Sequence, residues 1–128
     1  MIKYMLDTNI CIYLIRKHPP EIVEKFDNYR RGDICISSIT WAELCCGIRK
    51  DSDIIIKQLL EILKVVPFGF EEGQEFGKLS ELFPNRKANL DRLIAAHALA
   101  LGVTLVTNNL ADFEMYKPAG LILENWIC

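Results

Sequence analysis

Five short runs of strand-forming residues alternate with longer segments whose apolar residues recur at helical spacing. The strand-forming runs lie near residues 2–6, 33–37, 64–68, 103–107 and 121–123. The helical segments lie at about 8–17, 20–30, 40–50, 53–63, 70–83 and 89–101. Strands separated by helices indicate an α/β fold, because crossover helices cover both faces of a mostly parallel sheet. We therefore predict a three-layer α/β/α arrangement, with loops at 17–20, 30–33, 83–87 and 115–120, where Pro or Gly occurs among charges.

The chain of 128 residues has the usual size of one domain, so we expect a single domain over residues 1–128. No run of about 18 apolar residues is present, and the N-terminus lacks the pattern of a signal peptide. The five cysteines form no Cys-x-x-Cys pair and lie mostly in apolar segments, as reduced core cysteines do. These observations predict a cytoplasmic protein without a membrane span or a zinc site.

Composition limits the partners that the protein can have. The hydrophobic fraction of 51% leaves apolar surface near water, which favours a protein partner. The net charge of −2 and the pI near 5.7 are not the basic balance of a protein that holds nucleic acid through many phosphate contacts. Any binding of nucleic acid must therefore be local.

Acidic and amide side chains stand where strands end and helices begin. Asp7 ends the first strand, while Glu43 and Asp91 fall in what we expect to be the first turns of two later helices. Asn109 and Asp112 directly follow the fourth strand. In parallel α/β sheets these positions share one edge, which is where ligands bind. The sequence thus predicts a cluster of acids at that edge.

Each acid taken singly has a local explanation. Asp7 could cap a helix, Thr40 and Glu43 match a capping box, and Asp91 could complement a helix dipole. Capping does not require that the carboxylates share one edge, whereas a Mg²⁺ site requires oxygen ligands that converge. One or two Mg²⁺ or Mn²⁺ ions would activate a water for hydrolysis of a phosphodiester. This chemistry requires neither His18 nor His97.

Four motifs occur in a characteristic order: MLDTN, SSITWAEL, LDRLIAAHAL and TNNLADF. With this order and spacing the chain resembles PIN-domain ribonucleases, and among them the VapC toxins of bacterial toxin–antitoxin modules. The resemblance implies an endoribonuclease that depends on Mg²⁺, for which Mn²⁺ can substitute. It further implies a tRNA substrate, with the anticodon loop of initiator tRNA as a candidate, a VapB-like antitoxin that inhibits the enzyme, and a homodimer.

The resemblance places the family's first three acids on Asp7, Glu43 and Asp91, the expected metal ligands. The fourth position, an Asp in many PIN domains, is here Asn109, and Asp112 follows three residues later. An amide offers an oxygen but no charge, so the number of metal ions is left open. Either Asn109 or Asp112 could fill the fourth position. A PIN-like module that binds RNA or antitoxin without cutting is the alternative.

Other polar residues near these acids are candidates for supporting roles. Side chains that could orient the carboxylates are Thr8, Asn9, Thr40 and Thr107. Basic side chains close to the acidic edge, which could contact RNA phosphates, are Arg86, Lys87 and Arg92. The alternative for Arg86 and Lys87 is an ordinary solvated loop. Helices 8–17 and 40–63 also carry apolar residues that could line a groove for an amphipathic antitoxin segment.

Overall fold

The computed structural model describes residues 1–47, 53–84 and 89–127. Its strands form one five-stranded sheet in the order β3-β2-β1-β4-β5, and all four neighbouring pairs run parallel. The strands are β1 (Tyr4–Leu6), β2 (Ile34–Ser37), β3 (Lys64–Val66), β4 (Thr104–Val106) and β5 (Leu123–Glu124). Each strand lies within a predicted run or overlaps one, so the predicted parallel sheet is confirmed.

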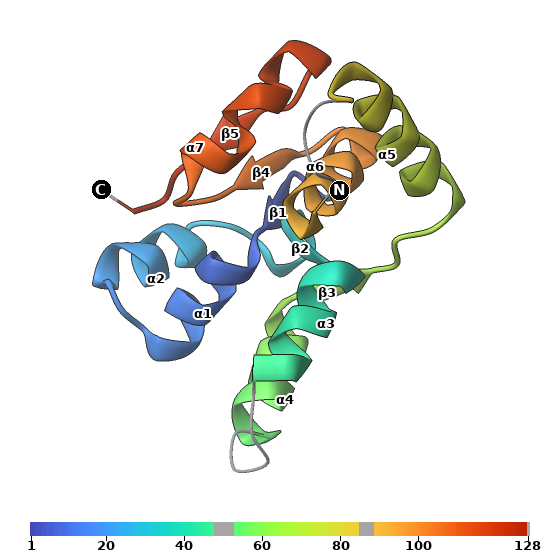
Figure 1. Cartoon of the computed structure of the whole chain (residues 1–128). Helices are drawn as coiled ribbons and strands as arrows, with labels where there is room; N and C mark the ends of the chain where they lie inside the picture. Colours follow the sequence, from blue (N-terminus) through green and yellow to red (C-terminus); the bar gives the residue numbers. More distant parts are fainter. Residues whose placement is uncertain (48–52, 85–88, 128) are drawn as a thin grey trace.

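Six longer helices correspond to the six predicted segments (Figure 1). They are α1 (Thr8–Arg16), α2 (Pro20–Asp27), α3 (Ser38–Gly47), α4 (Asp53–Ile62), α5 (Phe70–Leu82) and α6 (Leu90–Leu101). Among the described residues, the shorter elements are α7 (Leu110–Phe113) and the 3-10 helices η1 (Arg31–Asp33) and η3 (Glu114–Ala119). The loop predicted at 115–120 is largely η3, because a six-residue 3-10 helix carries too little periodicity to be recognised.

The two faces of the sheet carry separate hydrophobic clusters. Successive residues of a strand point to opposite faces, so Met5 packs with α5 and α6 while Leu6 packs with α1 to α4. Leu105 and Val106 of β4 divide in the same way. Burial on both sides explains why the strands read as continuous apolar runs, and it confirms the three-layer arrangement.

Of the four cysteines in the described residues, two are buried in the core and two are exposed. Cys11 and Cys35 are buried, and burial raises the pKa of the Cys35 thiol to about 12. Cys45 and Cys46 near the end of α3 are exposed, so the expectation of core cysteines is wrong for these two. Cys128 lies outside the described residues.

The direction in which successive strands are added to the sheet reverses between β1 and β4, which makes a topological switch point there. The chain adds β2 and then β3 on one side of β1, and later returns to place β4 and β5 on the other side. Helices that leave adjacent strands in opposite directions open a crevice at the carboxyl ends of those strands. Asp7 follows β1, and Thr107 follows β4, at this crevice. No helix in the described part of the chain is long and apolar enough to cross a membrane.

Candidate active site

A pocket of about 100 Å³ opens at the switch point between β1 and β4. It is lined by Asp7, Thr8, Asn9, Glu43, Asp91, Ile94, Asn109 and Phe113. The structure therefore brings together the three predicted acids and the amide of the fourth position. These residues lie in α1, α3, α6 and α7 or directly precede α1 and α7, although they span about a hundred positions of the chain.

Asp7 uses both oxygens of its carboxylate to hold the centre of the site. As the N-cap of α1, it accepts a hydrogen bond from the backbone N–H of Ile10 at Oδ1 (2.9 Å). Its Oδ2 accepts a bond from Thr107 Oγ1 (2.5 Å). Burial of Asp7, which is 4% exposed, raises the pKa of its carboxyl, and the charges of Asp91 and Glu43 add to the rise. The two hydrogen bonds act in the opposite direction without cancelling it.

Glu43 is held toward the same pocket by α1. Its Oε1 accepts a hydrogen bond from Thr8 Oγ1 at 2.7 Å, which joins α3 to the start of α1. The expectation that Glu43 lies in the first turn of its helix is wrong, since α3 begins at Ser38. The Oγ of Ser37 accepts a bond from the N–H of Ile39, and this local bond starts the helix earlier than predicted. The capping box of Thr40 and Glu43 is therefore absent.

Asp91 lies in the first turn of α6, as predicted. Asn89 caps this helix by accepting a bond from the N–H of Arg92 (3.0 Å), and Asp91 in the first turn also suits the helix dipole. Burial raises the pKa of Asp91, and the charges of Asp112 and Glu43 raise it further. Acids whose pKa is raised by neighbouring carboxylate charges favour a bound cation.

Thr107 connects the first acid to the segment after β4. It donates to Asp7 and accepts a hydrogen bond from the backbone N–H of Asn109 (2.9 Å). Asn109 lines the pocket, and its Nδ2 donates to Asp112 Oδ2 at 2.7 Å. Asp112 is exposed and is not among the residues that line the pocket.

Arg92 differs from its predicted role. Its side chain is 2% exposed, and its guanidinium donates to Tyr116 Oη, Ser80 Oγ and the carbonyl of Phe83, at 3.2 to 3.4 Å. The expectation that Arg92 contacts RNA phosphate is wrong for this arrangement, because the helix on which it lies turns it into the core. Arg86 and Lys87 lie outside the described residues.

Thr40 is fully buried, and its Oγ1 has no hydrogen-bond partner within the described residues. Ile94 and Phe113, which sequence reasoning missed, give the pocket an apolar wall. Their spacing could have identified them, since Ile94 follows Asp91 by three residues and Phe113 follows Asn109 by four, the separations that share a helix face.

The donor set fits a divalent cation with oxygen ligands. Three carboxylates and the amides of Asn9 and Asn109 line the pocket, and Mg²⁺ in proteins is bound by one or two carboxylates and several waters. Among the described residues, no three acidic, histidine or cysteine side chains form a cluster close enough to hold an ion by themselves. The acids therefore surround the pocket, and water would complete the coordination.

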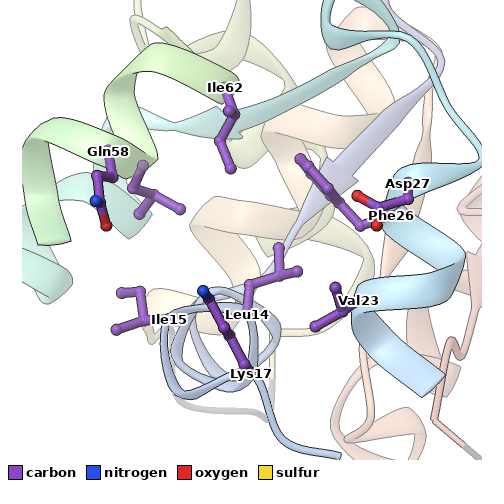
Figure 2. Close-up of a pocket in the computed structure, with 9 residues that line it drawn as sticks. Leu14, Ile15, Lys17, Val23, Phe26, Asp27, Gln58 and Ile62 are labelled. Carbon is purple, nitrogen blue, oxygen red and sulfur yellow. The ribbon is translucent and has the colours of Figure 1, made fainter. Parts of the chain in front are cut away.

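A second, apolar groove of about 230 Å³ lies beside the C-terminal end of α1. Figure 2 shows side chains from α1, α2 and α4 directed into it, among them Leu14, Val23 and Ile62. Lys17 and Asp27 also line this groove. Because Leu14 lies seven residues after Asp7, about two helical turns separate the groove from the acids.

Comparison with known proteins agrees with this geometry. The family model described as "PIN domain" matches residues 4–117. The chain belongs to the PIN domain family. PIN-domain ribonucleases generally depend on a divalent metal, which agrees with the donor set of the pocket.

Relatives and solved structures support a narrower grouping. The chain is 40% identical to Ribonuclease VapC2 of Haemophilus influenzae, over 99% of this chain and 100% of that protein. It is 34% identical to the tRNA(fMet)-specific endonuclease VapC of Shigella flexneri, over 98% and 99% of the two chains. A crystal structure of VapBC2 from Rickettsia felis, bound to a DNA fragment from its promoter, aligns with a TM-score of 0.86 and 37% identity, covering 99% and 100%. These findings confirm the predicted fold, family and nuclease class.

Proposed function

We propose that this PIN domain is a Mg²⁺-dependent endoribonuclease that cuts tRNA and is inhibited by a VapB-like antitoxin. The observation that carries the proposal is the convergence of Asp7, Glu43, Asp91 and Asn109 on one pocket at the switch point of the sheet. Mn²⁺ is expected to substitute for Mg²⁺, because both ions prefer oxygen ligands.

The chain's own residues would prepare the site for hydrolysis of a phosphodiester bond. Asp7, Glu43 and Asp91 would hold the cation directly or through bound water, and when bound it supplies the positive charge that activates water and offsets charge on the phosphate. Thr107 and Thr8 keep Asp7 and Glu43 in place through their hydrogen bonds. Ile94 and Phe113 exclude water from one wall of the pocket, which strengthens the electrostatic interactions inside.

The proposed substrate is an exposed RNA loop. A relative 34% identical to this chain is named a tRNA(fMet)-specific endonuclease, which supports initiator tRNA as the substrate. The net charge of −2 disfavours broad binding to the RNA backbone. Selective proteins of this kind recognise unpaired bases in loops, so we propose cleavage within the anticodon loop.

The proposed antitoxin would occupy the groove between α1, α2 and α4. A solved VapBC complex aligns with this chain at 37% identity, which supports an antitoxin partner. The groove offers apolar side chains flanked by Lys17 and Asp27, a composition that suits an amphipathic segment with both charge signs.

The test is cleavage of a total tRNA pool by the purified chain, with Mg²⁺, with EDTA, and with the Asp7→Asn variant. Asparagine caps helices as well as aspartate does, so the variant removes the charge and keeps the start of α1. We expect discrete products that require both Mg²⁺ and Asp7. Sequencing their ends identifies the cleaved loop.

A matched control is Asp33→Asn, which makes the same chemical change before β2, at the opposite end of the sheet. It should cut like the wild type. If folded wild-type protein without antitoxin cuts neither tRNA nor other RNA in Mg²⁺ or Mn²⁺, the nuclease proposal is wrong and the non-cutting module is favoured.

A further inference from the structure

The side chains of Asn109 and Asp112 form a hydrogen bond that two ionised carboxylates could not form. Asn109 Nδ2 donates to Asp112 Oδ2 at 2.7 Å, while Asn109 itself lines the pocket. Two carboxylates at this distance would repel one another. The amide at position 109 and the acid at position 112 therefore suit each other chemically.

The pair determines which end of the Asn109 amide faces the carboxylate. An ionised carboxylate can only accept hydrogen bonds, so the amide must turn its NH₂ group toward Asp112. The carbonyl oxygen Oδ1 occupies the other end of the same planar group and is turned away from Asp112. Only one of the two amide ends can serve a cation, because the NH₂ group carries positive partial charge and offers no lone pair.

The backbone around the pair limits other movements. The N–H of Asn109 donates to Thr107 Oγ1 (2.9 Å), and the N–H of Asp112 donates to the carbonyl of Asn109 (3.1 Å). These two bonds hold the main chain of the turn. The side-chain amide of Asn109 could still rotate, and its hydrogen bond to Asp112 prevents this rotation.

We propose that Asp112 is a positioning residue, which orients the Asn109 amide so that its carbonyl oxygen is available to a divalent cation in the pocket. This inference rests on the proposed function, since it requires a cation at the acids. It answers which residue fills the fourth position: Asn109 supplies the oxygen, and Asp112 acts through Asn109.

Two substitutions at position 112 separate the orientation of the Asn109 amide from the charge of Asp112. Asp112→Asn keeps an oxygen that can accept from Asn109 but removes the charge. Asp112→Ala removes both. If Asp112 acts through the hydrogen bond, the first variant retains function and the second loses it. If Asp112 acts as a charge or as a direct ligand, the two variants lose function alike.

The experiment measures binding of Mn²⁺ to the full chain without RNA, by the loss of the electron paramagnetic resonance signal of the free ion. We expect Asp112→Ala and Asn109→Ala each to weaken binding about tenfold, the scale for residues that orient metal ligands. The double variant should be no weaker than either single variant, because the two residues act as one unit. Asp112→Asn should bind within about threefold of the wild type. Melting temperatures establish that each variant is folded.

Three results would overturn the inference. Equal losses in Asp112→Asn and Asp112→Ala would assign the effect to charge. Wild-type affinity in Asp112→Ala would show that the orientation is irrelevant, while leaving the proposed nuclease intact. Failure of the wild type to bind Mn²⁺ at all would overturn both this inference and the proposed metal-dependent function.

Discussion

Single side chains in this site combine structural and functional contacts. Asp7 caps α1 with one oxygen and accepts from Thr107 with the other. The local explanation of this acid and the functional one are therefore compatible. A carboxylate that is already fixed by two hydrogen bonds loses little freedom when it binds a cation, which favours binding.

The hydroxyl of Thr8 allows a test of whether cleavage depends on the position of the Glu43 carboxylate. Thr8→Val keeps the shape of the side chain but removes the donor to Glu43 Oε1. We expect RNA cleavage to fall about 10- to 100-fold, because ligand-orienting bonds have effects of this size. Thr8→Ser retains a hydroxyl and should recover most of the activity. Cleavage rates across a series of Mg²⁺ concentrations measure this, and a fully active Thr8→Val would refute the role.

His97 predicts a pH dependence of stability. It is fully buried with Nδ1 2.8 Å from Ser37 Oγ, and burial lowers its pKa below the ordinary value of 6.5. The unfolded chain then takes up a proton in a pH range where the folded chain does not. The His97 contribution to the free energy of unfolding is therefore present above pH 6.5 and is lost as pH falls through the lowered pKa.

Urea unfolding of wild type and His97→Gln at about pH 7.5 and pH 5.5 measures this contribution. The wild type should lose more stability than the variant on acidification. Asp7 and Asp91, whose pKa values are raised, act in the opposite direction in both proteins, so the difference between the two isolates His97. Identical losses in the two proteins would contradict the prediction.

At the scale of elements, Arg92 joins the start of α6 to α5 and η3. Its guanidinium bonds to Ser80 on α5, to Tyr116 on η3 and to the carbonyl of Phe83 after α5. This joint sets the position of the first turn of α6, where Asp91 lies. A charged residue beside an acid is thus part of the framework that presents the acid.

Arg92→Met should destabilise the fold by about 2 to 4 kcal/mol, because three acceptors lose a buried donor. Tyr116→Phe removes one of these bonds and should cost about 1 kcal/mol. The control Arg16→Met changes an exposed arginine on α1 and should stay within about 0.5 kcal/mol. Urea unfolding gives all three values. A neutral Arg92→Met would contradict this role.

At the scale of the whole molecule, the acidic pocket and the apolar groove are separate surfaces. Val23→Glu places a charge in the groove, so we expect it to abolish neutralisation by the cognate antitoxin. RNA cleavage by the variant alone should persist, since the groove lies about two turns of α1 from Asp7. Cleavage assays with and without antitoxin measure both effects.

The matched control is Ile122→Glu, which alters an apolar residue, 62% exposed, next to β5. It should remain sensitive to the antitoxin. Undiminished neutralisation of Val23→Glu would place the antitoxin elsewhere on the molecule. The homodimer inferred from the resemblance stays a prediction, which sedimentation of the purified chain can test.

The sequence alone determined the order and type of the main elements and the edge at which the acids meet. These properties follow from local periodicity and from the parallel crossover rule, which need no knowledge of distant contacts. Motif order also identified the family before any geometry was known. Short elements such as α7 and η3 were not predicted, because four to six residues are too few to show a helical period.

Only the tertiary structure decided the role of each side chain at that edge. Thr107 reaches Asp7 across 100 positions of sequence, and Thr8 reaches Glu43 across 35. Arg92 looked like a phosphate contact beside Asp91, but packing against Tyr116, 24 residues away, turned it inward. Spacing along the chain predicts which backbone positions share an edge, whereas hydrogen bonding and burial between distant residues determine where each side chain points.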